Sequence, residues 1–356
     1  MTGPAKRVAL VLGGGGLKGF AHIGVLRALE ERGIRPSLYA GTSIGALLGA
    51  GYAAGLSTDE MARRAVALRR RDLFRLNHVG VLFGRMRAAS IYLEEPLRDL
   101  AESVAPGNLR FDQLDRPVLV NTVDVESGTQ VVWGSGGLRD VRVADAIYAS
   151  CALPGFFPPG PVGGRMCIDG GTVDNLPVGI AAVDADLIVA VDVGNADLTH
   201  ATEVHAQGFS AVFMRAASVM MHALQDISLG TWAGPPMLLI RPRVSHVPWF
   251  SFSQTEELMR EGYRAAVDAL THWDAFSNET GGVYPRRRVR VRVDRDRCTG
   301  CGLCVALEPR LMALDGQRKA YPVTESVEWS PAGGDFVRHC PAHAISVATE
   351  LPIAAD

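Results

Sequence analysis

The sequence lacks any apolar run long enough to span a lipid bilayer, and it lacks a recognisable export signal. Near the N-terminus, Lys6 and Arg7 precede only five apolar residues, Val8 to Leu12, before glycines begin. Such a run is too short for the core of a signal peptide or for a transmembrane helix. We therefore expect a cytoplasmic protein, with peripheral contact to the inner face of a membrane as an open option.

An excess of charge of one sign is also missing. The 36 Lys and Arg residues nearly balance the 38 Asp and Glu residues, giving a formal net charge of −2. We therefore predict no nucleic-acid partner. Apolar residues make up 47% and charged residues 21%, as in ordinary globular proteins. Because 356 residues exceed what one hydrophobic core usually serves, two domains are expected.

Cysteine is sparse over most of the chain and concentrated near its end. Of six cysteines, four follow residue 297. Without an export signal we expect a reducing compartment, where such crowding favours metal ligation over disulfides.

From residue 7 to about 275, short apolar segments alternate with longer amphipathic ones. Five segments are predicted to be strands: Val8–Leu12, Leu38–Ala40, Pro117–Val123, Gln130–Trp133 and Leu187–Val193. Four are predicted to be helices: Gly19–Arg32, Gly45–Ala54, Glu95–Ser103 and Thr255–Thr271. The nearly continuous apolar strands indicate burial on both faces. This alternation predicts a three-layer α/β/α domain around a largely parallel sheet.

A domain boundary is predicted after residue 276. Residues 277–287 are polar, contain two adjacent glycines and a proline, and are typical of a linker. Arg288 to Asp294 then alternates strictly between charged and apolar residues, as a strand with one basic and one apolar face does. We predict domains at residues 1–276 and 288–356.

The motif Gly41-Thr-Ser43-Ile-Gly45 follows a short predicted strand and opens an apolar helix. This context is the one a nucleophile elbow requires. A serine on so sharp a turn brings residues on either side very close together, which favours glycine at both positions. The following helix directs its N–H groups towards an oxyanion.

Two further motifs support this interpretation. Gly13 to Gly19 lies between the first strand and the first helix, and its backbone N–H groups can cradle negative charge. Beside a serine nucleophile this loop would serve as an oxyanion hole. Asp169-Gly170-Gly171 places an acid before two glycines that allow close backbone approach.

In this order, the three motifs resemble those of the patatin-like phospholipase family, over roughly residues 7 to 272. The matching motifs are Gly14-Gly15-Gly16-Leu-Lys18-Gly19, Gly41-Thr-Ser-Ile-Gly45 and Asp169-Gly170-Gly171, together with Ala149–Pro158. The resemblance implies a serine acyl hydrolase with a Ser43–Asp169 dyad. Ser43 would attack the acyl carbonyl, while Asp169 would accept the proton. A carboxylate needs a raised pKa, or a strongly stabilised alkoxide, to do so.

Two alternative sites fit the residues less well. Gly14-x-Gly16-x-x-Gly19 also fits a dinucleotide fingerprint, but the second strand ends without the required carboxylate. An α/β-hydrolase triad would need a histidine after Asp169, and none of the three downstream candidates lies in a recognisable motif: His222, His246 and His272.

Single residues near these motifs have simpler interpretations. His22 is expected to pack within its helix, and Lys18 to be a solvated loop lysine unless it orients the loop or contacts a phosphate. Cys151 and Cys167 are expected to be small buried hydrophobes.

Basic residues interleave with apolar ones at Leu68–Leu76 and Val79–Arg87, and His246–Phe252 is rich in aromatic residues. These segments are either a cap that rests on an anionic membrane or ordinary cover for the sheet.

Cys298-Thr-Gly300-Cys301-Gly302-Leu-Cys304, with Cys340-Pro341 further on, has the spacing of cluster ligands. Residues 288–348 resemble a bacterial-type ferredoxin with a single [4Fe–4S] cluster, which implies that all four cysteines ligate one cluster. A zinc site is the competing interpretation.

The combined hypothesis is a phospholipase or lysophospholipase with an iron–sulfur domain for redox sensing or electron transfer. Its expected substrate is a phospholipid or another acyl-ester lipid. Arg288, Arg290 and Arg292 form a basic strand face that could dock an acidic redox partner protein. The alternative is an electron carrier whose patatin-like domain serves as a lipid-binding anchor.

Overall fold

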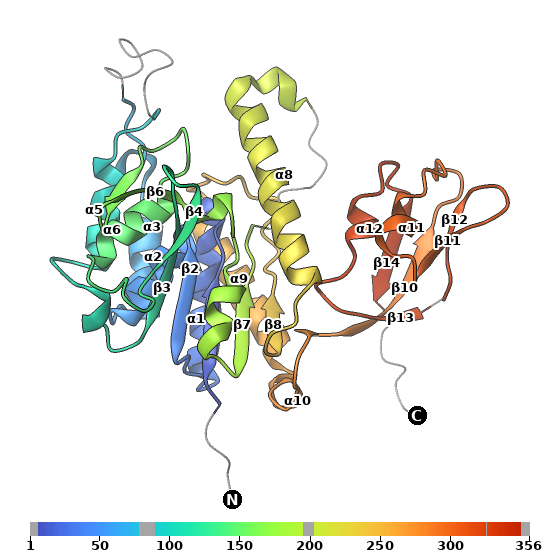
Figure 1. Cartoon of the computed structure of the whole chain (residues 1–356), viewed down its shortest axis with the longest axis horizontal. Helices are drawn as coiled ribbons and strands as arrows, with labels where there is room; N and C mark the ends of the chain where they lie inside the picture. The colour runs from blue at the N-terminus through green and yellow to red at the C-terminus, as the bar shows by residue number, and fades with distance from the viewer. Residues whose placement is uncertain (1–5, 78–89, 195–202, 325, 350–356) are drawn as a thin grey trace, which may run out of the picture. The chain divides into compact units, whose positions relative to one another are not determined.

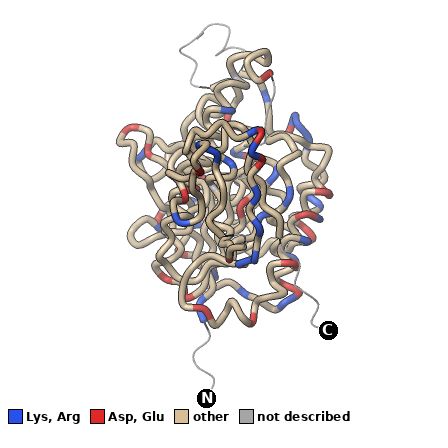
Figure 2. The backbone as a smooth tube through the Cα atoms, turned by 90° about the vertical axis from the view of Figure 1, so that its right-hand side faces the viewer, with Lys and Arg blue, Asp and Glu red and all other residues tan. Residues whose placement is uncertain are grey.

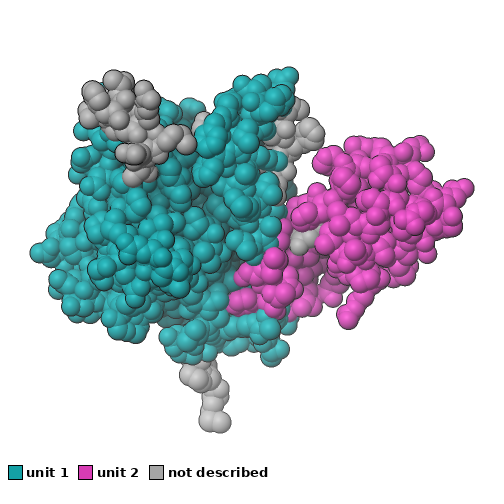
Figure 3. All heavy atoms as spheres, turned by 45° about the horizontal axis from the view of Figure 1, so that its top comes forward, with its two compact units in different colours: residues 1–225, 233–282 teal, residues 226–232, 283–356 magenta. Residues whose placement is uncertain are grey.

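The computed structural model describes residues 6–77, 90–194, 203–324 and 326–349 (Figure 1). The chain forms two compact units, coloured separately in Figure 3. Unit 1 comprises residues 1–225 and 233–282, and unit 2 comprises residues 226–232 and 283–356. Basic and acidic residues are interspersed along the backbone (Figure 2). Within the described part of the chain, no helix has the length and apolar character needed to cross a membrane.

Unit 1 is built on a mostly parallel sheet. Its strands run in the order β5-β6-β3-β2-β1-β7-β8, and β4 pairs with β3. The strands from β3 to β8 along this order are parallel, whereas β4, β5 and β6 pair in antiparallel fashion. Their bounds are β1 Val8–Leu12, β2 Leu38–Thr42, β3 Val118–Asp124, β4 Thr129–Trp133, β5 Gly160–Val162, β6 Arg165–Asp169, β7 Leu187–Val191 and β8 Met237–Ile240.

Every residue of β1 and β7 is buried, as expected for apolar strands covered on both faces. Helices lie on both sides of this sheet (Figure 1). They are α1 Ala21–Glu31, α2 Ile44–Ala53, α3 Thr58–Ala67, α5 Glu95–Val104, α6 Val143–Cys151, α7 Val178–Ala181, α8 Phe209–Gly230, α9 Thr255–Leu270 and α10 Trp273–Phe276. The predicted three-layer α/β/α architecture is confirmed.

Unit 2 is a small α+β fold. An antiparallel sheet of order β13-β10-β14 is accompanied by the hairpin β11-β12. Val289 and Val291 of β10 are buried while Arg288, Arg290 and Arg292 are exposed, as the alternating sequence predicts. The elements are β9 Val283–Tyr284, β10 Arg287–Val293, α11 Leu303–Leu307, β11 Met312–Leu314, β12 Ala320–Pro322, β13 Ser326–Trp329, α12 Asp335–Arg338 and β14 Ile345–Thr349.

Candidate active site and cysteine cluster

Ser43 occupies the sharp turn between β2 and α2. Its backbone has φ 54° and ψ −126°, a strained conformation for a residue with a side chain. The turn packs against β1 so closely that a Cβ on Gly45 would lie 2.0 Å from the carbonyl oxygen of Leu12. A Cβ on Gly41 would lie 2.6 Å from the nitrogen of Ala46. Both glycines are therefore required by close backbone approach, and the turn has the geometry of a nucleophile elbow.

Asp169 ends β6 and is buried in the same pocket wall as Ser43. The N–H of Gly171 donates a hydrogen bond of 2.8 Å to its Oδ1. Burial raises the pKa of Asp169 to about 6, although the Gly171 N–H and the Ser43 hydroxyl partly offset this rise by hydrogen bonding. The carboxylate is thus a stronger base than a solvated aspartate, while still ionised at neutral pH.

The glycine loop lies against the serine. A Cβ on Gly14 would stand 3.3 Å from the Cβ of Ser43. Gly14 is held by Asn175, whose carbonyl oxygen accepts its N–H at 3.0 Å and whose Nδ2 donates to its carbonyl oxygen at 3.2 Å. Among the described residues, the N–H groups of Gly15 and Gly16 make no hydrogen bond. These two N–H groups are therefore the ones available to an oxyanion.

Lys18, within this loop, and His22, which follows it, are both buried. Lys18 is only 1% exposed rather than solvated, and burial lowers its pKa to about 8. The Nε2 of His22 lies 2.9 Å from the carbonyl oxygen of Gly13, so a hydrogen bond from the ring fixes the start of the loop. Burial lowers the pKa of His22 to about 4, which keeps the ring neutral with Nε2–H as the donor.

Sequence reasoning missed Asn121, a buried polar residue in the middle of β3. Its Nδ2 donates to the carbonyl oxygens of Asp174 at 2.7 Å and Gly170 at 3.2 Å. It also lies 3.2 Å from the Oγ1 of Thr42, the residue before Ser43. Asn121 therefore ties the turn that carries Ser43 to the segment that follows Asp169.

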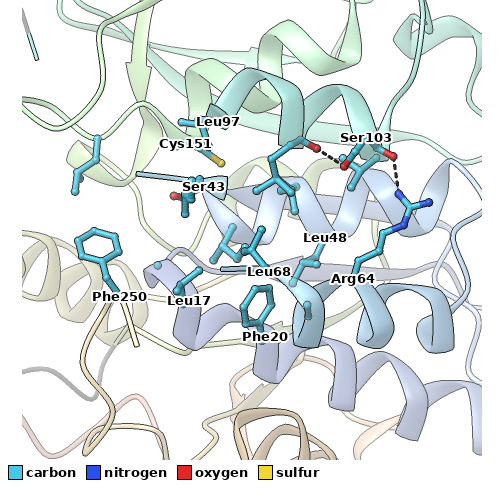
Figure 4. A pocket seen from close by; sticks show the side chains of 18 of the residues that line it. Leu17, Phe20, Ser43, Leu48, Arg64, Leu68, Leu97, Ser103, Cys151 and Phe250 are labelled. Carbon is cyan, nitrogen blue, oxygen red and sulfur yellow. Dashed lines mark hydrogen bonds between the residues drawn. The ribbon is translucent and has the colours of Figure 1, made fainter. Parts of the chain in front are cut away.

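An apolar pocket opens at Ser43 and Asp169 (Figure 4). Its volume is about 980 Å³, including the part open to solvent. Cys151 lines it beside Ser43 and is only partly buried, whereas Cys167 is buried as expected. Burial raises the pKa of the Cys151 thiol.

Two of the three segments interpreted as either a membrane cap or ordinary cover for the sheet meet at this pocket. Leu68, Leu73 and Phe74 line it, while Arg69 to Arg71 are exposed. The ring of Phe250 lies 4.9 Å from that of Phe74. The third segment, Val79–Arg87, lies outside the described residues. The described segments thus cover the pocket with apolar side chains and direct basic ones outward.

The histidines of the triad alternative lie elsewhere. Among the described residues that line this pocket there is no histidine. His246 instead pairs with Glu257 at 3.1 Å, and His222 is buried on α8. This arrangement favours a carboxylate as the base.

In unit 2, Cys298, Cys301, Cys304 and Cys340 line one cavity of about 330 Å³. The N–H of Ala320 points to the Sγ of Cys298 at 3.5 Å, and the N–H of Ala344 to the Sγ of Cys340 at 3.4 Å. Such N–H contacts stabilise ligating thiolates. Among the described residues, no three His, Cys, Asp or Glu side chains converge on a single metal ion. Four sulfurs spread around one cavity fit the larger cage of a four-iron cluster.

The fold and these contacts define the class of unit 1: an α/β protein with a serine elbow facing a buried aspartate beside an apolar pocket. Residues 10–182 match the sequence model described as patatin-like phospholipase. Residues 291–347 match the model described as a 4Fe-4S single cluster domain. Both resemblances found in the sequence are thereby confirmed.

Individual relatives cover parts of the chain. An uncharacterized NTE family protein of Mycobacterium tuberculosis is 40% identical over 54% of this chain and 51% of its own length. Lysophospholipase NTE1 of Debaryomyces hansenii is 28% identical over 82% of this chain and 19% of its own length. The crystal structure of the type III effector ExoU of Pseudomonas aeruginosa has 16% identity, a TM-score of 0.41, and coverage of 78% of this chain and 54% of that chain. The chain thus spans about half or less of the curated relatives' length.

Proposed function

We propose that this protein hydrolyses the carboxylic ester bonds of lipids, with Ser43 as nucleophile and Asp169 as general base. The observation that carries the proposal is the strained Ser43 turn beside a buried carboxylate of raised pKa, at one end of an apolar pocket. The match of residues 10–182 to the patatin-like phospholipase model supports a lipid substrate. Phospholipids and lysophospholipids are the proposed substrates, and the name of the yeast relative favours the latter.

The proposed reaction proceeds by acyl transfer. Ser43 Oγ attacks the ester carbonyl carbon as its proton passes to Asp169. The oxyanion that forms accepts hydrogen bonds from the N–H groups of Gly15 and Gly16, with Gly14 positioning the loop. The intermediate collapses, and the leaving alcohol takes the proton from Asp169. Water then attacks the carbonyl carbon of the acyl-serine as its proton passes to Asp169. The second tetrahedral intermediate expels Ser43 Oγ, which takes that proton back from Asp169, and the fatty acid leaves.

Several motif residues have supporting roles in this proposal. Lys18 and Gly19 position the glycine loop, Gly41 and Gly45 permit the elbow, and Gly170 and Gly171 permit the backbone to pass Asp169 closely.

The hydrolase proposal is tested with chromogenic acyl esters, wild-type protein and Ser43→Ala. The wild type should turn over and the variant should not. Ser127→Ala, which changes an exposed turn serine, is the matched control and should behave as wild type. If wild type and Ser43→Ala hydrolyse at the same rate, the proposal is wrong.

For unit 2 we propose that Cys298, Cys301, Cys304 and Cys340 ligate a [4Fe–4S] cluster. When bound, such a cluster supplies one-electron transfer or redox sensing. Acyl transfer to water needs no electron. The cluster is therefore proposed either to regulate ester hydrolysis or to exchange electrons with an acidic redox partner protein that docks at the exposed arginines of β10. Equal hydrolysis rates with the cluster oxidised, reduced and lost would exclude regulation.

Membrane contact and domain boundaries are also proposals. The basic surface of residues 69–71 predicts stronger binding to anionic than to neutral vesicles, weakened by salt. Equal binding to both vesicle types would exclude it. The proposed domains are residues 1–276 and 288–356, and limited proteolysis should cut first within residues 277–287.

A further inference from the structure

The apolar pocket continues well beyond Ser43, between three helices. Past the catalytic end its wall consists of side chains from α2, α3 and α5, including Leu47, Leu48, Met61, Leu97, Leu100 and Val104. In Figure 4, Ser43 lies to the left of Arg64, and Leu48 and Leu68 lie between them. An acyl chain attached at Ser43 would therefore run along α2 towards Arg64.

Arg64 closes the far end by bridging two helices. Its Nη1 donates to the carbonyl oxygen of Ser103 at 2.7 Å, and its Nε donates to Glu60 Oε1 at 2.6 Å. The side chain is 42% exposed, yet it lines the pocket together with Ser103. The aliphatic stem therefore completes the apolar wall while the guanidinium faces water. Among the described residues of the pocket wall, Arg64 and Asp169 are the only charged ones. Asp169 lies at the end that holds Ser43, and Arg64 lies at the other end.

We propose that the Arg64–Ser103 bridge sets the longest acyl chain that this site accepts. This inference rests on the proposed hydrolase function and deepens it by naming a length limit. An acyl chain that outgrows the pocket must either displace the bridge or bend back into water. Both alternatives lose the burial that favours binding of each further methylene.

The length of the pocket follows from α2. A Cβ on Gly51 would lie 3.2 Å from the Cβ of Val104, the residue after Ser103, so Gly51 marks the level of the bridge. Eight residues separate Ser43 from Gly51, which is about 12 Å at about 1.5 Å per helical residue. An extended hydrocarbon is a zigzag of bonds of about 1.5 Å that advances about 1.3 Å per bond, so about ten carbons cover that distance. Medium acyl chains are therefore the expected optimum.

The proposal is tested by measuring kcat/KM for p-nitrophenyl esters from butyrate to palmitate, using the full chain. Arg64→Ala should raise the palmitate-to-octanoate ratio about tenfold, the discrimination typical of a misfit in an apolar pocket. Arg63→Ala is the matched control, because Arg63 also bonds Glu60 on α3 but is 73% exposed and does not line the pocket. Its chain-length profile should equal that of wild type.

A second variant and a binding measurement keep the test independent of catalysis. Arg64→Met keeps a long apolar side chain but cannot form the hydrogen bonds of the bridge. If those hydrogen bonds hold the far end of the pocket closed, this variant should accept longer acyl chains than wild type. In the Ser43→Ala background, saturated fatty acids of increasing length compete with a fluorescent fatty acid for the pocket. If the wild type hydrolyses no ester but fatty-acid binding shows a length limit that depends on Arg64, the hydrolase proposal is rejected and the length-limit proposal stands. Unchanged profiles for Arg64→Ala and Arg64→Met in both assays would overturn it.

Discussion

The backbone N–H of Ser43 donates a hydrogen bond of 2.8 Å to the hydroxyl oxygen of Ser150. That hydroxyl in turn donates to the carbonyl oxygen of Asn121 at 2.7 Å. Ser150 is fully buried on α6, so no water can replace it at the Ser43 N–H. The strained φ of the proposed nucleophile is therefore held by a relay that runs from α6 to β3.

Ser150→Ala should weaken both stability and catalysis. The buried N–H of Ser43 would lose its acceptor, which costs about 1–3 kcal/mol of unfolding free energy. Since the elbow then relaxes, we expect kcat to fall more than KM changes. Ser37→Ala is the control, because Ser37 also donates to a carbonyl of unit 1, that of Val8 at 3.2 Å, but lies away from the pocket. A variant that loses stability while keeping the wild-type kcat would show that the relay is only structural.

Asn121→Asp should be more damaging than Asn121→Ala. The amide Nδ2 donates to two carbonyl oxygens, those of Asp174 and Gly170. An aspartate would place a negative oxygen against these acceptors in a buried site, which costs about 3 kcal/mol or more. Denaturant unfolding of the two variants measures the difference. Equal free energies of unfolding would mean that the hydrogen bonds donated by the Asn121 amide are not what stabilises β3.

The parts of the site with strict steric requirements could be predicted from the sequence. The elbow of Ser43 was identifiable because glycine is needed at both Gly41 and Gly45, and the structure shows the backbone contacts responsible. The strands that place these parts were also recognisable, since β1 and β7 are continuously apolar. The catalytic roles of Ser43 and Asp169 remain predictions that enzyme assays must test.

Other features depend on contacts between distant segments, which no local pattern records. β6 was not predicted, because only two of its five residues are buried where it pairs in antiparallel fashion between β5 and β3. Asn175 clamps Gly14 from 161 residues away, and a single asparagine in a loop gives no sign of this. Asn121 offered one usable signal: an amide within the apolar segment Val118–Asp124 must find buried partners. The same reasoning would have predicted the burial of Lys18 only if the packing of the elements around it had been known.

Ester hydrolysis should depend on pH through Asp169. Because the pKa of its carboxyl is about 6, kcat/KM should rise with pH around a midpoint near 6 and level off above it. His22 should not contribute to this profile, since its pKa of about 4 keeps it neutral throughout. The profile is measured with an ester whose leaving group does not itself titrate in this range. A midpoint near 4 would mean that the base is a solvated carboxylate.

The same carboxyl should make folding stability fall as pH rises from about 4 to 6. Its folded pKa lies above the unfolded value of 3.8, so over this range the unfolded chain ionises first. A shift of about two units corresponds to about 3 kcal/mol by pH 7. Asp169→Asn should therefore be more stable than wild type at pH 7 by up to this amount, and equal to it near pH 4. Asp174, whose pKa burial also raises to about 6, titrates in both proteins and drops out of the difference.

Cys340→Ala should separate the iron–sulfur domain from the hydrolase. With three thiolates left in the cavity of unit 2, the iron content and visible absorbance of anaerobically purified protein should fall well below wild type. Chromogenic ester hydrolysis should persist, because no step of acyl transfer requires an electron. Cys167→Ala is the control: Cys167 is buried in unit 1 between strands and should leave the iron content unchanged. Hydrolysis lost together with the iron, in a variant whose unit 1 still unfolds cooperatively at the wild-type temperature, would instead mean that the cluster is required for hydrolysis rather than regulating it.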